Sequence, residues 1–211
     1  MFKFLKEARR RRFREHRAQN PEKMPFVDVE LRHTEGARLL PSKIELLRHL
    51  PKGGRVAEIG VADGDFSAEI LRHNQPAVLT LVDAWHTDRY GPGETRVQAR
   101  FAKEIASGHV VICKGLSLDE MAKMPERSLD WVYIDTDHSY GLTSKELVAG
   151  ARLVAPEGRI CGDDFVVGNV RTGNKYGVIQ AVNEFCVTHG WAYEYLTLEG
   201  TGYFSFCLKR L

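Results

Sequence analysis

The sequence predicts an α/β fold: a mostly parallel sheet of seven strands with helices on both of its faces. The first observation is that short apolar runs alternate with helical segments between residues 56 and 189, which is typical of parallel strands joined by helices. The second is that two apolar runs, 191–198 and 203–209, follow each other with no helix between them. They predict a C-terminal hairpin, so that one strand is antiparallel. A chain of 211 residues that is 43% hydrophobic can form one such domain.

The predicted elements can be placed in order along the chain. Residues 42–50 read as a helix that begins after Ser42, with Glu45 in the capping-box position. Gly108 ends the helix expected at 93–107, and Pro156 with Gly158 stops the helix expected at 141–154. The remaining helices are expected at 66–73, 117–124 and 177–189. The five strands that precede the hairpin are expected at 56–60, 78–83, 110–114, 129–135 and 159–163.

The N-terminal segment differs from the rest in charge. Residues 1–20 contain eight Lys or Arg and two Glu, a net charge of +6, whereas the remainder has 22 basic and 26 acidic residues. We therefore divide the chain into a basic helical arm and lead-in, 1–40, with a helix at 2–18, and a domain, 41–211. The arm suits an anionic surface, a nucleic acid or a second subunit of a homo-oligomer. A basic helix that lies on the acidic body explains it equally well.

Cysteine usage and hydropathy indicate the compartment. The four cysteines form no CxxC pair, which disfavours zinc and redox sites and favours buried reduced thiols. No apolar run approaches the length of a membrane span, and the start has no segment suited to a signal peptide. A cytoplasmic protein without a transmembrane segment is expected.

The most informative stretch is Val-Ala-Glu-Ile-Gly-Val-Ala-Asp-Gly-Asp-Phe-Ser, residues 56–67. A strand, a glycine turn from Gly60 through Asp63 to Gly64, and a helix N-terminus together let a small molecule lie against bare backbone. Glu58 stands at the end of the strand, which favours a ligand with hydroxyl or ammonium donors over a pyrophosphate.

The next two strands also end in polar residues. Asp83 lies 23 residues after Gly60, a distance at which an acid accepts hydrogen bonds from ribose hydroxyls, and Ala84 and Trp85 follow it. Trp85 could cover the adenine, or Asp83 could be a cap beside a packed tryptophan. Ser117 could cap the next helix or bond an adenine nitrogen.

Acids also end the fourth and fifth strands. Neighbouring parallel strands bring Asp135 close to Asp163 and Asp164, and three carboxylates form a hard site suited to Mg²⁺. Such a metal orients a substrate hydroxyl and lowers its pKa. A histidine with an ordinary pKa suits proton removal near neutral pH, so His138 is a candidate base, although it could instead bond Asp135 or Asp164 structurally.

Together these motifs resemble the class I S-adenosylmethionine-dependent methyltransferases, whose sheet is Rossmann-like. The motifs that carry this resemblance are Glu-Ile-Gly-Val-Ala-Asp-Gly (58–64), Ile-Asp-Thr-Asp-His-Ser-Tyr (134–140), Gly-Asp-Asp-Phe (162–165) and Gly-Val-Ile-Gln-Ala-Val-Asn-Glu-Phe (177–185). They resemble the methyltransferase-24 group, which includes macrocin-type enzymes and, more distantly, catechol-type enzymes. The resemblance covers residues 40–210.

The resemblance implies S-adenosylmethionine as cofactor and assigns roles to individual positions. The cofactor would contact Glu58, Gly60, Asp63, Gly64, Asp83, Ala84, Trp85, Ser117 and Asp135. In metal-dependent relatives an acid and a pair 28 and 29 residues later bind the ion, which matches Asp135, Asp163 and Asp164. The catalytic residues would be His138 and Asp135, with His138 at the position where the catechol enzymes have a basic residue.

The implied function is Mg²⁺-dependent O-methylation of a small hydroxylated acceptor such as a sugar, a phenol or a natural product. A nicotinamide-dependent oxidoreductase is an alternative, but the usual Gly-x-Gly-x-x-Gly is absent. A non-catalytic cofactor-binding protein is another. A nucleic-acid substrate is not expected, because no Asn/Asp-Pro-Pro-Tyr-like motif follows the fourth strand.

Overall fold

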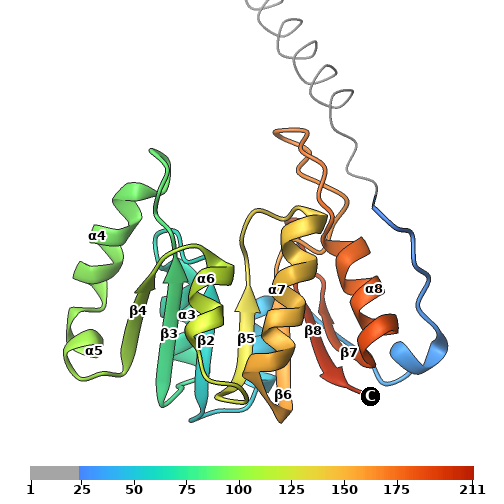
Figure 1. Cartoon of the computed structure of the whole chain (residues 1–211), viewed down its shortest axis with the longest axis horizontal. Coiled ribbons are helices and arrows are strands. Elements are labelled where there is room, and N and C mark those ends of the chain that lie inside the picture. The colour runs from blue at the N-terminus through green and yellow to red at the C-terminus, as the bar shows by residue number, and fades with distance from the viewer. Residues whose placement is uncertain (1–23) are drawn as a thin grey trace, which may run out of the picture.

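A computed structural model describes residues 24–211, and its main feature is one sheet of eight strands in the order β1-β7-β8-β6-β5-β2-β3-β4 (Figure 1). The strands are β1 Arg38–Leu40, β2 Arg55–Ile59, β3 Val78–Asp83, β4 Val110–Lys114, β5 Leu129–Ile134, β6 Val154–Gly162, β7 Trp191–Thr197 and β8 Phe206–Arg210. The helices are α2 Lys43–His49, α3 Asp65–His73, α4 Gly91–Arg100, α5 Ala102–Ala106, α6 Ser117–Lys123, α7 Tyr140–Leu153 and α8 Val178–His189, with a 3₁₀ turn η1 at Leu31–His33.

The pairing of the strands confirms a mostly parallel sheet with an antiparallel C-terminal hairpin. Strand β8 is antiparallel to both of its neighbours, β6 and β7, and the other pairs are parallel. The expected number of seven strands is wrong by one, because β1 pairs with β7 from Arg38↔Tyr195 to Leu40↔Thr197. Three residues are too few to show an alternating pattern in the sequence. The sheet therefore begins inside the segment that we treated as a lead-in.

Two further differences concern element boundaries. The helix expected at 93–107 is interrupted at Phe101, which leaves helical geometry (φ −108°, ψ 23°) and buries its ring in the core. Strand β6 begins at Val154 rather than near 159, and its register with β5 shifts between Leu129 and Trp131. The basic helix expected at 2–18 lies outside the described residues.

Helices cover both faces of the sheet, as expected. Helices α6, α7 and α8 bury residues such as Met121, Leu147 and Val182 against one face, and α6 and α7 lie in front of the sheet in Figure 1. Helices α2, α3 and α4 bury Leu46, Ile70 and others against the opposite face. Strand β5 supplies both layers, because its side chains alternate in direction.

Ser42 accepts a hydrogen bond from the Glu45 amide at 3.2 Å, so it caps α2 as expected. A second side chain, that of Asn74, joins α3 to the end of α2. At the end of α3 the buried Asn74 donates through Nδ2 to the carbonyls of Leu47, Leu50 and Pro51 at 3.1 to 3.2 Å. This contact fixes the turn that precedes β2.

All four cysteines are free thiols, three of them in strands and one in α8. Among the helices from residue 24 onward, none combines the length and apolar character that a membrane span requires.

Candidate functional site

The glycine turn lies where the carboxyl ends of β2, β3 and β5 meet. The Gly60 amide donates to the Val82 carbonyl, and the Asp135 amide donates to the Ile59 carbonyl, both at 2.8 Å. Gly60 has φ +91°, and a Cβ on it would lie 1.9 Å from the Asp135 carbonyl oxygen. A side chain at this position would separate the strands, so the turn requires glycine.

Gly64, at the other end of the turn, is equally constrained. It precedes α3 in the left-handed region (φ +76°), and a Cβ would lie 2.9 Å from the Phe101 ring. Asp63 points toward α4, where its carboxylate pairs with Arg96 at 2.5 Å, and both side chains are about half exposed. The turn is thus packed against α4 on its outer side.

The carboxylate of Asp83 holds the turn from the side of β3. Its Oδ2 accepts the amides of Val61 (2.8 Å) and Ala62 (2.9 Å), and its Oδ1 accepts the amide of Trp85 (2.8 Å). Oδ2 thus uses both of its lone pairs, and Oδ1 keeps one with which it can accept a further hydrogen bond. Asp83 is therefore a structural element of the turn, whether or not it also contacts a ribose.

Trp85 and Ala84 follow Asp83 but differ in exposure. The Trp85 indole is 4% exposed, packs in the core, and donates through Nε1 to the Ala62 carbonyl at 2.8 Å. It therefore supports the turn from beneath, as in the packed-tryptophan interpretation. Ala84 is half-buried beside it.

Glu58 is a buried acid directly ahead of the turn. Its side chain is 2% exposed, and the Ser67 hydroxyl of α3 donates to it. Burial, supported by the neighbouring Asp135 and Asp83 and opposed by Ser67, raises the pKa of Glu58 to about 8. A buried carboxyl of this kind is stabilised by a cation, which fits the ammonium group of an amino-acid-bearing ligand.

Ser117 does not cap α6, because Leu116 occupies the N-cap position. It interacts instead with Glu146, a fully buried residue of α7 that also accepts the Thr136 hydroxyl at 2.8 Å. Burial raises the pKa of Glu146 to about 7, and Ser117 and Thr136 counteract part of that rise. Sequence reasoning missed Glu146. The available signal was an acid on the helix face that also buries Thr143, Leu147 and Gly150.

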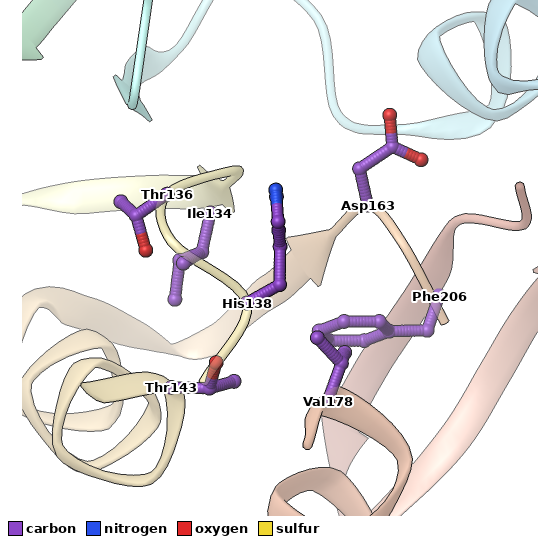
Figure 2. Close-up of a pocket in the computed structure, with 7 residues that line it drawn as sticks. All are labelled: Ile134, Thr136, His138, Thr143, Asp163, Val178 and Phe206. Atoms are coloured by element: carbon purple, nitrogen blue, oxygen red, sulfur yellow. The ribbon is translucent and has the colours of Figure 1, made fainter. Parts of the chain in front are cut away.

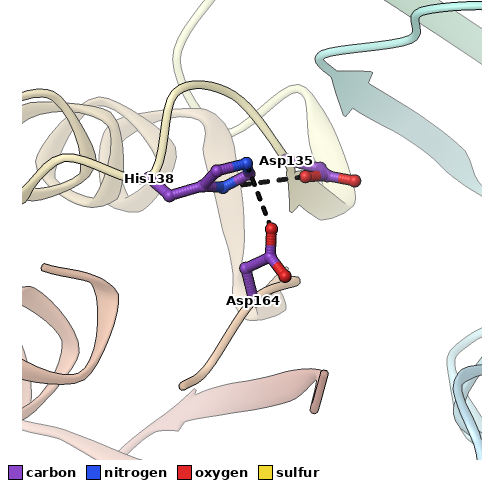
Figure 3. A group of neighbouring side chains, drawn as sticks. All are labelled: Asp135, His138 and Asp164. Atoms are coloured by element: carbon purple, nitrogen blue, oxygen red, sulfur yellow. Dashed lines mark ion pairs between the residues drawn. The ribbon is translucent and has the colours of Figure 1, made fainter. Parts of the chain in front are cut away.

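Three polar side chains converge where β5 and β6 end (Figure 3). His138 Nε2 lies 3.1 Å from Asp164 Oδ2, and His138 Nδ1 lies 3.9 Å from Asp135 Oδ1. One ligand atom from each of the three lies within 4.8 Å of the others. His138 (φ +62°) and Asp164 (φ +53°) both adopt left-handed backbone geometry. Such strain gathers at functional sites.

Burial perturbs the protonation of this group. Burial raises the pKa of Asp135 to about 8, with Asp163 and Asp164 adding to the rise. It also raises the pKa of Asp164 and lowers that of His138, although Asp164 opposes the latter. A hard cation at this point would favour the ionised acids, so the donor set fits a divalent metal ion.

Asp163 does not join this group, contrary to the expected set of Asp135, Asp163 and Asp164. Its Oδ2 accepts Lys43 Nζ at 2.5 Å, and its Oδ1 accepts the Ser205 hydroxyl at 3.0 Å. Consecutive residues at a strand end point in different directions, so the adjacent Asp163 and Asp164 face different partners. His138 takes the third place in the cluster.

A small cavity adjoins the acid cluster (Figure 2). Its volume of about 10 Å³ is at the lower limit of what holds a single water molecule. It is lined by Ile134, Thr136, His138, Thr143, Asp163, Val178 and Phe206. His138 thus has one side toward the acids and another toward this cavity.

Comparisons with known proteins agree with this geometry. The family model described as a methyltransferase domain matches residues 57–165, which include the turn, Asp83 and the acid cluster. The comparison with curated proteins found no match.

Solved structures with 13–14% identity share the fold. The pyocyanin biosynthetic protein PhzM matches with a TM-score of 0.61, covering 80% of this chain and 54% of its own, so this chain spans about half of that protein. The B. subtilis tRNA methyltransferase TrmK (0.58; 82% of this chain and 67% of its own) is also similar. So is an Aquifex aeolicus SAM-dependent methyltransferase (0.57; 79% and 87%).

The family match decides between methyl transfer and the nicotinamide alternative. It covers just over half of the chain, and the Rossmann-like sheet with its antiparallel hairpin agrees with it. The chain therefore belongs to the methyltransferase domain family.

Proposed function

We propose that this enzyme methylates a hydroxyl group of a small acceptor, such as a sugar or a phenol, with the help of a divalent metal ion such as Mg²⁺. The observation that carries the proposal is the convergence of Asp135, His138 and Asp164 at the carboxyl ends of β5 and β6. Ligands of open α/β sheets bind at this edge, beside the glycine turn. The acceptor oxygen would therefore meet the methyl donor here.

The cofactor side of the site is assigned to the turn and its supports. Glu58 would accept the ammonium group of S-adenosylmethionine, and Asp83 would accept a ribose hydroxyl with the remaining lone pair of its Oδ1. Gly60 and Gly64 would let the backbone approach the cofactor. Asp63, Ala84, Trp85 and Ser117 would border the pocket, with Trp85 acting through the turn because it is buried.

The metal would be held by the carboxylates of Asp135 and Asp164. When bound, the ion would orient the acceptor hydroxyl and lower its pKa. Asp135 would thereby serve catalysis as well as metal binding, and its backbone already positions Gly60. Two carboxylates leave coordination positions for water and for the acceptor.

His138 would accept the proton of the acceptor hydroxyl. Burial lowers its pKa, so the imidazole is neutral near pH 7 and has a free lone pair. Asp164, at 3.1 Å, would stabilise the imidazolium once the proton has moved. Transfer of methyl from a sulfonium is an in-line displacement, so positioning supplies much of the rate.

The test combines cofactor binding with turnover. Calorimetry should show S-adenosylhomocysteine binding to both the wild type and Asp164→Asn. S-adenosylhomocysteine release with a panel of phenols and sugars should fall at least about 100-fold in Asp164→Asn and in excess EDTA. Asp28→Asn is the matched control, since it removes an exposed acid that lies outside the strands and helices of the site. Full activity in excess EDTA would remove the metal from the mechanism.

A further inference from the structure

A lysine stands among the acids of the site. Lys43 is the first residue of α2, and its Nζ lies 2.5 Å from Asp163 Oδ2. Its charge also acts on Asp135, Glu199 and Glu58. Lys43 thus connects the cofactor side of the site, at Glu58, with the acid end of β6.

The position of the ammonium group is fixed by its surroundings. The Lys43 amide donates to the Glu199 carboxylate, which also accepts the Thr197 hydroxyl of β7. Its Nζ lies 5.3 Å from the centre of the Phe66 ring, and its side chain is 35% exposed. A lysine with these contacts is a built part of the site rather than a solvated surface charge.

The acids around it need compensation. Glu58, Asp135, Asp163 and Asp164 gather at the ends of β2, β5 and β6. Burial lowers the pKa of Lys43, but Asp163, Asp135 and Glu199 together raise it more, so the amine remains charged. That charge and a divalent ion would both be attracted to Asp163, and both cannot occupy the same space.

We propose that Lys43 is a positioning residue that serves as a built-in cation, holding Asp163 out of the metal group and restricting the metal to the carboxylates of Asp135 and Asp164. The inference rests on the proposed metal-assisted function. It explains why the expected carboxylate set of Asp135, Asp163 and Asp164 does not form in the structure. It also assigns to α2, which precedes the matched family region, a direct effect on the metal site.

The proposal predicts a gain of metal affinity when the lysine is removed. In Lys43→Met, Asp163 Oδ2 loses its partner, and Mn²⁺ affinity measured by EPR at pH 8 should rise at least about tenfold. Lys43→Arg keeps the charge and should bind Mn²⁺ as the wild type does. Lys52→Met, which removes an exposed lysine ahead of β2, controls for net charge. The double variant Lys43→Met with Asp163→Asn should lose the gain.

S-adenosylhomocysteine binding by calorimetry and the melting temperature report the fold of each variant. Unchanged or weaker Mn²⁺ binding in a folded Lys43→Met would overturn the role of Lys43 while leaving the metal-assisted function in place. Binding only in Lys43→Met would support the role of Lys43 and remove the metal from the wild-type mechanism. No Mn²⁺ binding in either protein would overturn both, although cofactor binding would still identify the methyltransferase.

Discussion

Glu146 offers a quantitative test of the structure, because it is a fully buried acid that does not belong to the acid cluster. Its pKa rises from an ordinary 4.5 to about 7. In the folded protein Glu146 therefore keeps its proton to higher pH than in the unfolded chain. Below about pH 4.5 both states are protonated, and its contribution to stability is fully present.

As the pH rises from 4.5 to 7, the unfolded chain releases this proton while the folded chain retains it, so stability falls. At about 1.4 kcal/mol for each pKa unit, the loss reaches roughly 3 kcal/mol and then stays constant above pH 7. Glu146→Gln cannot ionise, and its amide oxygen can still accept the Thr136 hydroxyl. Relative to wild type, the variant should gain roughly 3 kcal/mol between pH 4.5 and pH 8.

Urea unfolding followed by tryptophan fluorescence at pH 5, 6, 7 and 8 measures this difference. Glu126→Gln, at an exposed glutamate, is the matched control and should follow the wild type at each pH. If the stabilities of wild type and Glu146→Gln run parallel from pH 5 to pH 8, Glu146 is not a neutral buried acid, and the reasoning is wrong.

Three further substitutions test the supports of the site and the fold. Gly60→Ala places a Cβ against the Asp135 carbonyl and should cost more than about 3 kcal/mol, whereas Gly53→Ala, at φ +68° with open space around it, should cost only about 1 kcal/mol; thermal melting compares them. Asp83→Asn leaves backbone amides of the turn facing an amide group and should abolish S-adenosylhomocysteine binding in calorimetry; retained affinity would contradict the role given to the carboxylate. Asn74→Ala leaves three carbonyls without their donor and should lower the unfolding free energy by about 2 kcal/mol in urea titration; a loss below about 0.5 kcal/mol would show that solvent replaces the side chain.

Local sequence patterns predicted the frame of the molecule well. The strands at 78–83 and 110–114 have the expected bounds, because each is an apolar run with polar or glycine residues at its ends. Asp83 and Asp135 were placed at strand ends by the same argument. The three-residue β1 was not visible, because its pairing with β7 involves residues about 157 positions away.

The partners of the site residues were the least predictable part. Nothing local marks Lys43, which opens an ordinary amphipathic helix, as the partner of Asp163, and the separation of 120 residues hides the contact. Similarly, spacing alone suggested that Asp163 and Asp164 act together, whereas their side chains face different neighbours. Strand ends can be predicted from periodicity, but side-chain direction at a strand end depends on the packed structure.

The place of β8 in the sheet has a consequence for biosynthesis. Because β8 lies between β6 and β7, the edge of the sheet formed by β7 and β1 cannot join the rest until β8 has been made. Ser205, directly before β8, donates to Asp163, so the last strand also completes the acid end of the site. On the ribosome, the turn and the central strands can form first, while β1 remains an unpaired edge for most of translation. The newly made chain is therefore most exposed to misassembly before the hairpin closes.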